Sequence, residues 1–351
     1  MRKINIFKVL AAGVIVYGMS SCKSSDIEFP DYTEQTVYFA YQTPVRTIVL
    51  GMDDLGSTAD NDTRACKIYS TMGGTYNGGK YNIKVDIAVD NSLCDNLYFD
   101  QACTNPVLPM PSSHYQLGGS VIEYQGEKGY VDVQLTDAFF ADPKSYQAQY
   151  VIPVVMKSQT GATRILSGEL QEGVSSANRF DLSSWFVKPQ DYVLYCVRYI
   201  SKYHGYYLPQ GTVTTSAEGG VKMNSKIYKY PNWESVPSEN VVYLYTRGEN
   251  TVALDLVATL GAESYNISAL LTFNGNTCTI TSNDPDFKIT GTGTYTEKSP
   301  SYNWGQKDRD GLKIQFKAEG KGVVVDVDYD MALQRRGSGN TVEEFNVTLK
   351  K

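Results

Sequence analysis

Two tryptophans lie in short loops whose composition suits the binding of sugars. Trp233 stands in the segment YPNWESVP and Trp304 in SPSYNWGQKDRDG, with Tyr230 and Tyr302 close by and several amides and carboxylates around them. An aromatic ring stacks on the C–H face of a sugar, whose hydroxyl groups need polar partners. Trp233, Trp304, Tyr230 and Tyr302 are therefore candidates for binding a glycan. The alternative is that each tryptophan closes one end of a β-barrel.

The segment DYVLYCVRYISKYHGYYLP, residues 191–209, is rich in tyrosine. A rim of Tyr203, His204, Tyr206 and Tyr207 is a further candidate for stacking on a sugar ring, although packing in the protein interior is the simpler interpretation. Cys196 lies in the middle of this expected strand with no histidine on its own face. This favours a buried structural thiol over a nucleophile.

Three aspartates alternate in VVVDVDYDMAL, which places Asp326, Asp328 and Asp330 on one face of a strand. Paired carboxylates carry out glycoside hydrolysis, and the pattern is similar to the D-x-D-x-E signature of family 18 chitinase-like enzymes. The signature is incomplete, because an aspartate replaces its glutamate. The C-terminal segment is also too short for the (β/α)8 barrel of those enzymes, which needs about 250 residues. A solvent-facing or calcium-tolerant acidic strand is the favoured interpretation.

Other catalytic constellations are missing from the sequence. The two histidines, His114 and His204, belong to no G-x-S-x-G elbow, and there is no phosphate-binding loop or dinucleotide fingerprint. Asp60-Asn61-Asp62 lacks the spacing of an EF-hand. The sequence therefore predicts a protein without catalytic activity, cofactor or metal site.

The N-terminus has the plan of a secretory signal peptide. Arg2 and Lys3 precede a short apolar run, and small residues precede Cys22. Met19-Ser20-Ser21-Cys22 resembles a bacterial lipobox, so we expect cleavage of residues 1–21 and acylation of Cys22, which would anchor the protein to a membrane. Residues 22–34 are polar and acidic, as in an extended tether. They also resemble the signal that sends Bacteroidetes lipoproteins to the outer face of the outer membrane.

Composition narrows the class of protein. The formal net charge of −6 argues against a general nucleic-acid surface, and 27 tyrosines suit an extracellular β-rich chain. Besides Cys22 there are five cysteines, an odd number that leaves at least one thiol unpaired in an oxidising compartment. Cys94 and Cys103 flank a loop and could close a disulfide, since their spacing permits it.

Short alternating apolar runs, separated by Gly, Asn, Asp and Pro, predict an all-β chain. Residues 35–170 are expected to form an antiparallel sandwich and residues 171–189, which are polar and small, a linker. Residues 190–351 contain eight or more consecutive strands, which favours an up-and-down barrel that closes its own edges.

Several segments together resemble a family of two-domain Bacteroidetes surface lipoproteins from glycan-utilisation loci. They include YFAYQTPVRTIVLG, CKIYSTMGG, VLPMPSSHYQL, VDVQLTDAFFADP and KPQDYVLYCVRYISKYHGYYLPQG. The resemblance implies an N-terminal immunoglobulin-like sandwich, which is also found ahead of endo-β-N-acetylglucosaminidase catalytic domains, and a C-terminal lipocalin-like barrel. It implies capture or presentation of host or dietary glycans at the cell surface without catalysis.

The leading hypothesis is a lipid-anchored, non-enzymatic glycan-binding protein of the outer membrane that faces the cell exterior. Its expected partners are a glycan, the membrane through the lipid anchor, and other surface proteins of the same glycan-uptake system, but no nucleic acid. One alternative is an adhesin or assembly subunit that binds a protein partner. Another is a small glycoside hydrolase using Asp326, Asp328 and Asp330.

Overall fold

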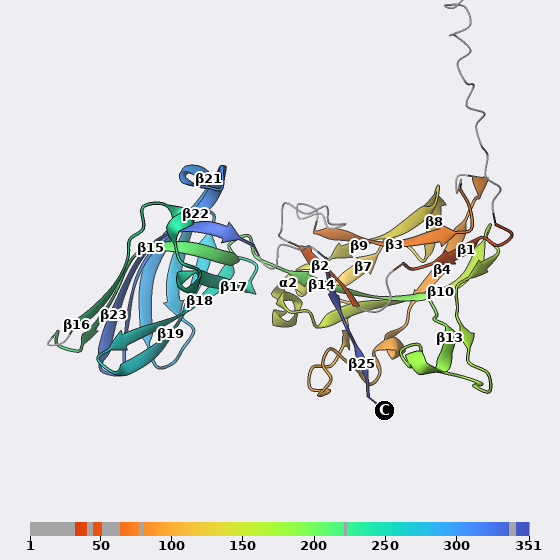
Figure 1. Cartoon of the computed structure of the whole chain (residues 1–351), viewed down its shortest axis with the longest axis horizontal. Helices are drawn as coiled ribbons and strands as arrows, with labels where there is room; N and C mark the ends of the chain where they lie inside the picture. Colours follow the sequence, from red (N-terminus) through yellow and green to blue (C-terminus); the bar gives the residue numbers. More distant parts are fainter. Residues whose placement is uncertain are drawn as a thin grey trace, which may run out of the picture.

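The expected all-β architecture is confirmed. In the structure, a computed structural model, 59% of the residues are in strands and 8% in helices. They form an N-terminal body and a C-terminal barrel (Figure 1). Among the described residues, no helix combines the length and apolar character that a membrane crossing requires. The signal peptide, Cys22 and most of the tether lie outside the described residues, which are 32–40, 45–50, 64–76, 80–220, 223–336 and 342–350.

The N-terminal body is a sheet that curls back on itself, in the order β11-β1-β3-β9-β8-β4-β10-β14-β2-β24. Alternation along its strands builds the core. In β9, Val131 and Val133 point inward, and they share a cluster with Val193 and Tyr195 of β14. The strands are β1 (Thr36–Tyr38), β2 (Val45–Leu50), β3 (Ala65–Gly73), β4 (Lys84–Val89), β6 (Leu108–Pro109), β7 (Tyr115–Leu117), β8 (Val121–Gln125), β9 (Lys128–Leu135), β10 (Tyr150–Thr160), β11 (Arg164–Ile165), β14 (Tyr192–Tyr199) and β24 (Val342–Phe345).

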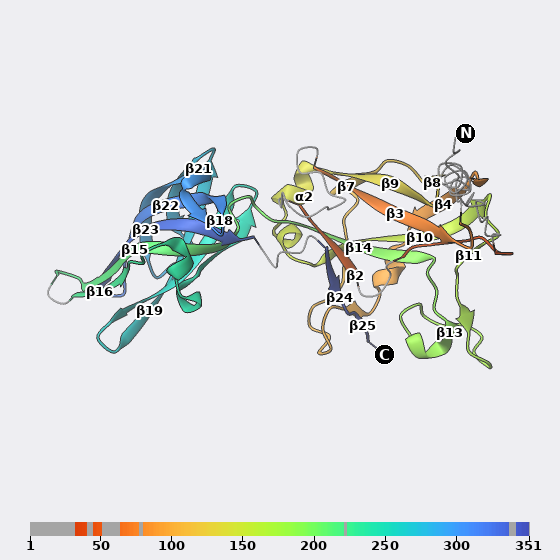
Figure 2. The same ribbon diagram turned by 45° about the horizontal axis from the view of Figure 1, so that its top comes forward.

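Smaller elements lie around the main sheet of this body (Figure 2). Two short pairs of strands stand beside the main sheet, β12 with β13 and β5 with β25. The elements are α2 (Asp137–Ala141), η2 (Asn91–Cys94), η3 (Pro143–Tyr146), η4 (Leu182–Ser184), β5 (Leu97–Tyr98), β12 (Glu169–Leu170), β13 (Trp185–Val187) and β25 (Thr348–Leu349).

The strand β14, expected in the barrel, belongs instead to the N-terminal sheet, where it lies between β10 and β2. Both of its faces are buried, Val193 and Tyr195 in one cluster and Leu194 and Cys196 in another. Apolar alternation does not say which core a strand joins, and a strand buried on both faces suits the centre of the larger sheet. The tyrosine-rich segment is therefore divided between the two bodies.

The expected domain boundaries change accordingly. The 171–189 segment is not an extended linker, because it holds η4 and β13, and Arg179 forms an ion pair with the buried Asp191, 2.7 Å between Nη2 and Oδ2. The chain also returns after the barrel, since β24 pairs with β2 and β25 with β5. The barrel is thus inserted between β14 and β24 and does not run to the C-terminus (Figure 1).

The C-terminal body is a closed, eight-stranded antiparallel barrel. Neighbouring strands follow one another in sequence, and β15 closes the ring by pairing with β23 from Tyr206↔Arg335 to Ala217↔Val323. β16 pairs with the far half of β15. The bounds are β15 (Gly205–Ala217), β16 (Met223–Tyr228), η5 (Trp233–Ser235), η6 (Ser238–Asn240), β17 (Val242–Gly248), β18 (Thr251–Leu260), β19 (Glu263–Asn274), β20 (Thr277–Ser282), β21 (Lys288–Trp304), β22 (Lys307–Gly320) and β23 (Val323–Arg335).

Side chains fill the barrel interior. A single cluster joins inward-facing residues of its strands, among them Leu254, Leu271, Leu312 and Met331, which are fully buried. The functional surface of this body must therefore be sought on its outer wall and at its ends.

Contacts between the two bodies gather around Glu249, in the β17–β18 turn. Its carboxylate forms an ion pair with Arg64, which also lies 2.9 Å from Asp137. Its backbone carbonyl accepts a hydrogen bond from Tyr199 Oη at 3.2 Å. Beside them, the Ser201 N–H donates to Thr246 Oγ1 at 3.0 Å.

Candidate functional site

The two tryptophan loops, whose tryptophans are 71 residues apart in sequence, come together on the barrel. The indole Nε1 of Trp233 donates to Ser301 O at 3.0 Å, and its ring centroid lies 5.7 Å from that of Tyr302. Glu234 Oε1 accepts the Gly305 N–H at 2.9 Å. Trp304 Nε1 donates to Leu333 O at 3.0 Å, and both indoles are half-buried. The structure thus forms one tryptophan cluster, made of Trp233, Tyr302 and Trp304.

Within this cluster, Tyr302 packs and does not face solvent. Its side chain is buried, and burial together with the Asp330 carboxylate raises the pKa of its phenol. Tyr230 is half-buried against the barrel core, and its hydroxyl accepts a hydrogen bond from Asn240 at 2.7 Å. Both tyrosines pack against the barrel. This agrees better with the alternative interpretation, in which each tryptophan closes one end of the barrel, than with glycan binding.

Gly311 leaves the room that the Tyr302 ring occupies. A Cβ atom at Gly311 would lie 1.9 Å from Tyr302 Cε2, so Gly311→Ala must displace the ring and loosen Trp233. We expect a loss of about 1–3 kcal/mol in the free energy of unfolding and a red shift of tryptophan emission. Urea titration followed by fluorescence tests this. Gly119→Ala, whose Cβ would meet its first neighbour at 3.9 Å, is the control; equal stability of the two variants would contradict the packing described.

Three of the four expected rim residues are buried. Tyr203 stacks on Phe273, with centroids 3.5 Å apart, and donates to Gly275 O at 2.7 Å. Tyr207 is fully buried and donates to Tyr203 O at 2.9 Å. His204 is 7% exposed. Only Tyr206, half-buried, remains available at the surface.

Tyr206 begins a row of tyrosines on the outer wall that the sequence analysis did not identify. It pairs across strands with Tyr243 of β17, and the two rings stack with centroids 4.5 Å apart. Tyr243 is 40% exposed and is followed by Tyr245, at 6.0 Å and 25°. Arg335 lies 4.1 Å over Tyr206 and Arg247 lies 4.7 Å over Tyr245. We call Tyr206, Tyr243 and Tyr245 the tyrosine ladder.

The buried His204 side chain holds the ladder in place by a hydrogen bond to Tyr243. Its Nδ1 accepts the Thr246 N–H at 3.2 Å, which places the proton on Nε2, and this nitrogen donates to Tyr243 Oη at 3.3 Å. Burial, with smaller contributions from Arg198 and Arg336, lowers the pKa of His204 to about 4. The imidazole therefore stays neutral near pH 7 and holds Tyr243 in position.

This arrangement predicts a pH dependence of stability. Below about pH 6.5 the unfolded chain binds a proton at His204 that the folded chain does not, so folding weakens as the pH falls from 6.5 towards 4. The loss reaches about 3 kcal/mol at pH 4, where the unfolded chain is protonated at His204 and the folded chain is only half protonated. Urea unfolding of the wild type and His204→Gln between pH 7.5 and 4.5 isolates this contribution. Parallel curves for the two proteins would contradict it.

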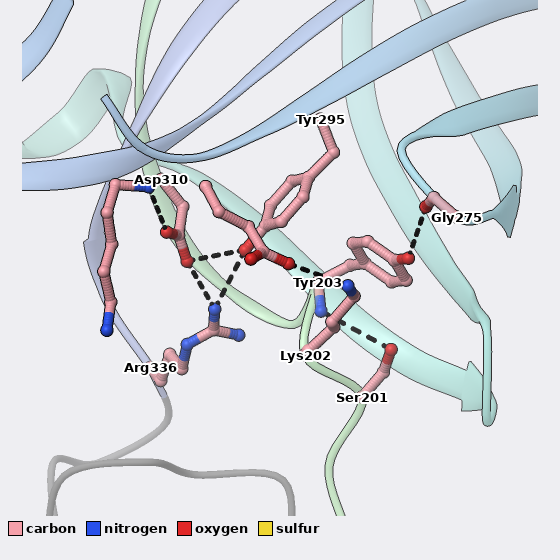
Figure 3. Close-up of polar contacts among 9 residues, drawn as sticks. Ser201, Lys202, Tyr203, Gly275, Tyr295, Asp310 and Arg336 are labelled. Atoms are coloured by element: carbon pink, nitrogen blue, oxygen red, sulfur yellow. Dashed lines mark hydrogen bonds and ion pairs between the residues drawn. The ribbon is translucent and has the colours of Figure 1, made fainter. Parts of the chain in front are cut away.

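An ionic network closes the end of the barrel near its connection to the N-terminal body (Figure 3). Asp310 Oδ2 accepts hydrogen bonds from Tyr295 Oη at 2.5 Å and from Arg336 Nη2 at 2.7 Å, while Oδ1 accepts the Lys298 N–H at 3.0 Å. Burial is the main cause that raises the pKa of the Tyr295 phenol. Tyr203 lies beside this network, so the buried tyrosines Tyr203 and Tyr295 stabilise the barrel and are not available to a ligand.

The three alternating aspartates lie on the outer wall opposite basic or amide side chains of β22. Asp326 pairs with Lys317, Asp328 with Gln315 and Asp330 with Lys313. Gln315 Nε2 donates to Asp328 at 3.1 Å, and Lys313 lies 3.4 Å from Asp330. Thr212, Gln315 and the first two aspartates line a shallow groove of about 310 Å³. The described residues contain no group of three or more potential metal ligands. These contacts fit the solvent-facing acidic strand.

The possible Cys94–Cys103 disulfide is not formed in the structure, where both cysteines are free thiols. Cys94 at the end of η2 enters the buried cluster that also contains Cys196, whereas Cys103 lies in the loop near Gln101 O. Sequence spacing permits the bond but does not direct both side chains to one point. Burial raises the pKa of Cys66, Cys94 and Cys278 to about 12, so these thiols are protonated near neutral pH. Cys196 is fully buried, as expected.

Another polar chain lies in the N-terminal body. Ser113 Oγ lies 3.1 Å from His114 Nδ1, and His114 Nε2 lies 3.1 Å from Asp142 Oδ2. Asp142 also accepts hydrogen bonds from Tyr150 Oη at 2.8 Å and from the first turn of η3 through the Lys144 N–H at 2.9 Å. The serine and histidine are adjacent in sequence, and the carboxylate caps η3. The chain of bonds therefore fastens α2 and η3 to the sheet.

The N-terminal body also carries a groove of about 440 Å³. Residues 91, 92, 94–98 and 106–109 line it. Its lining includes Asp95 and Tyr98 but no stacked aromatic surface like the ladder.

Comparison with known proteins places the chain in a family. A Bacteroides ovatus protein of unknown function is 30% identical, with a TM-score of 0.81 over 92% of this chain and 100% of that one. The chain belongs to the same family as this Bacteroides ovatus protein. In the present chain, a family model described as a domain of unknown function, DUF5627, matches residues 202–337, which form the barrel. A second model, described as an N-terminal domain, matches residues 32–163.

Two further structures from the genus Bacteroides are much less similar. A multidomain protein including DUF1735 from Bacteroides ovatus is 13% identical, with a TM-score of 0.45 over 88% of this chain and 99% of that one. An auxiliary nutrient binding protein from Bacteroides thetaiotaomicron is also 13% identical, with a TM-score of 0.41 over 83% and 91%. Among curated proteins, none matches the chain.

Proposed function

We propose that this protein is a non-enzymatic glycan-binding lipoprotein, anchored through Cys22 at the outer surface of the outer membrane. The barrel presents the binding surface, and the N-terminal body holds the barrel away from the membrane. The observation that carries the proposal is the tyrosine ladder, in which Tyr243, 40% exposed, stands between Tyr206 and Tyr245 on the outer wall.

The ladder has the two properties that sugar binding requires. The centroids of Tyr243 and Tyr245 are 6.0 Å apart, more than the 3.5–4.0 Å or so of direct ring contact, so each ring leaves part of its surface uncovered. Phenol hydroxyls and the N–H groups of Arg335 and Arg247 supply hydrogen-bond partners next to these apolar surfaces. A row across β15 and β17 suits an extended chain of sugars more than a single small molecule.

The barrel wall also fixes the positions of the ladder side chains before a ligand binds. Tyr206 and Tyr243 are directly opposite in the β15–β17 register, and His204 fixes the Tyr243 hydroxyl. Tyrosine has few rotatable bonds, so little conformational entropy is lost when a ligand orders it. Of the aromatics predicted from the sequence, Tyr206 joins this surface, while the tryptophan cluster adjoins it through Leu333, two residues before Arg335 on β23.

A glycan array tests the proposal. The soluble body from Ser24 onward is applied to a broad array, and each bound glycan is then incubated with the protein and analysed by mass spectrometry. We expect binding to at least one class of polysaccharide with its mass unchanged. Cleavage of the bound glycan would contradict the non-enzymatic role. Binding to no glycan would overturn the proposal and favour a protein partner.

A further inference from the structure

Three arginines on the barrel lie over aromatic rings of its outer surface. Arg335 covers Tyr206 and Arg247 covers Tyr245, at the two ends of the ladder. Arg309 lies 4.4 Å over the ring of Trp304, whose indole bonds to Leu333 O beside Arg335. A guanidinium stacked on a ring keeps its N–H groups in its own plane, where they can bind a ligand.

Two of these arginines, Arg247 and Arg309, have no acidic partner among the described residues, unlike several other arginines. Arg64, Arg164, Arg179 and Arg336 each form an ion pair with an aspartate or glutamate. Among the described residues, no carboxylate lies within ion-pair distance of Arg247 or Arg309. Arg247 contacts the hydroxyl of Tyr245 at 3.5 Å, and Arg309 Nε is buried without a hydrogen-bond partner.

Acidic side chains around the ladder and the tryptophan cluster accept hydrogen bonds from neutral groups. Asp255 accepts hydrogen bonds from Tyr245 Oη at 2.8 Å and from Ser268 at 2.5 Å. Asp308 accepts one from Asn303 at 2.7 Å, and Glu234 accepts the Gly305 N–H. The chain as a whole carries a net charge of −6. The positive charge along the ladder is therefore local and opposite in sign to the net charge of the protein.

We propose that the ladder binds an anionic polysaccharide, whose carboxylate or sulfate groups are held by Arg247 and Arg309 while its sugar rings contact the tyrosines. The planar guanidinium offers two parallel N–H groups to a carboxylate or sulfate, and both arginines already lie over aromatic rings. This inference rests on the proposed function and names the class of glycan that the site takes.

Titration calorimetry with defined polysaccharides tests it. Polygalacturonate supplies carboxylates, chondroitin sulfate supplies sulfates as well, and neutral galactan supplies neither. We expect the soluble body to bind one or both acidic polymers, with affinity that falls as salt rises, because screening weakens charge pairs at the surface. Binding of polygalacturonate identifies carboxylate as sufficient, and binding of chondroitin sulfate alone identifies sulfate.

Single arginine substitutions test which side chains bind the acidic polymer. Arg247→Gln and Arg309→Gln are each expected to weaken acidic-polymer binding about ten-fold and to reduce its salt dependence, since a charge-assisted hydrogen bond is lost. Arg247→Lys keeps the charge without the planar fork, so it should retain the salt dependence but not the full affinity. Arg164→Gln, which removes an arginine paired with Glu34 on the N-terminal body, is the control and should bind normally. Thermal melting confirms that each variant is folded.

The outcomes separate this inference from the proposed function. Ladder-dependent binding of galactan with no preference for acidic polymers would overturn the anionic specificity and leave glycan binding intact. Acidic binding that Arg247→Gln and Arg309→Gln leave unchanged would overturn the assignment of these arginines. Binding to no polysaccharide here or on the array would overturn both proposals.

Discussion

Replacing Asp310 with alanine is expected to lower the free energy of unfolding of the barrel by about 3–5 kcal/mol. The Asp310 and Arg336 side chains are only 12% and 14% exposed, so the variant would leave the Arg336 charge in a poorly solvated site without its partner. It would also remove the acceptor for Tyr295 Oη and the Lys298 N–H (Figure 3). Three elements lose a shared contact, namely β21, β22 and the segment after β23.

Urea unfolding followed by far-ultraviolet circular dichroism measures this effect. Asp308→Ala, two positions away, removes an exposed carboxylate that contacts Asn303 and should cost less than about 0.5 kcal/mol. Adding Arg336→Met to Asp310→Ala should recover part of the stability, because the unpaired charge is then gone. A loss as small as that of Asp308→Ala would contradict the structural role of the network.

Removing the ladder is expected to abolish most glycan binding without loss of fold. A central aromatic of a binding surface contributes about 2 kcal/mol or more on truncation to alanine, so Tyr206→Ala with Tyr243→Ala should weaken binding at least about 100-fold. Tyr206 is half-buried and Tyr243 is 40% exposed, so neither belongs to the barrel interior. Titration calorimetry with the glycan selected on the array gives the affinities.

The matched control is Tyr130→Ala in the N-terminal body, because Tyr130 is 38% exposed and also contacts a neighbouring tyrosine, Tyr69, with ring centroids 5.3 Å apart. It should bind like the wild type. Trp233→Ala should affect stability more than binding, since its indole is tied to Ser301 and packed on Tyr302. If Trp233→Ala removes binding while the ladder variant retains it, the tryptophan cluster is the site and the ladder is not.

Alternation along the strands was enough to predict the architecture. In β9 and β23, buried and exposed residues follow one another in the order that the sequence indicates. The boundary at residue 190 failed because β14 is apolar on both faces, a pattern that suits either body. Its assignment depends on pairing with β10 and β2, which are distant in sequence. The return of the chain through β24 and β25 depends on long-range pairing in the same way.

The candidate site was predicted only in part. Sequence chemistry selected aromatic loops, and the structure brings Trp233 and Trp304 together, but it also buries Tyr203, Tyr207 and Tyr302. The period of two in NVVYLYTR places Tyr243 and Tyr245 on one face, a signal that was present but overlooked. Their pairing with Tyr206 could not be foreseen, because it depends on the register between β15 and β17.

Hydroxyl-radical footprinting with and without the bound glycan tests the central claim, that the outer wall of the barrel is the binding surface. Tyrosine side chains are oxidised in proportion to their exposure, and the ladder provides a reporter in Tyr243, at 40%. We predict that the glycan lowers oxidation of Tyr243 and its neighbours Tyr206 and Tyr245, while Tyr130 and the 72% exposed Phe186 react as before. Unchanged oxidation of the ladder, with protection confined to Tyr98 in the groove of the N-terminal body, would contradict the account.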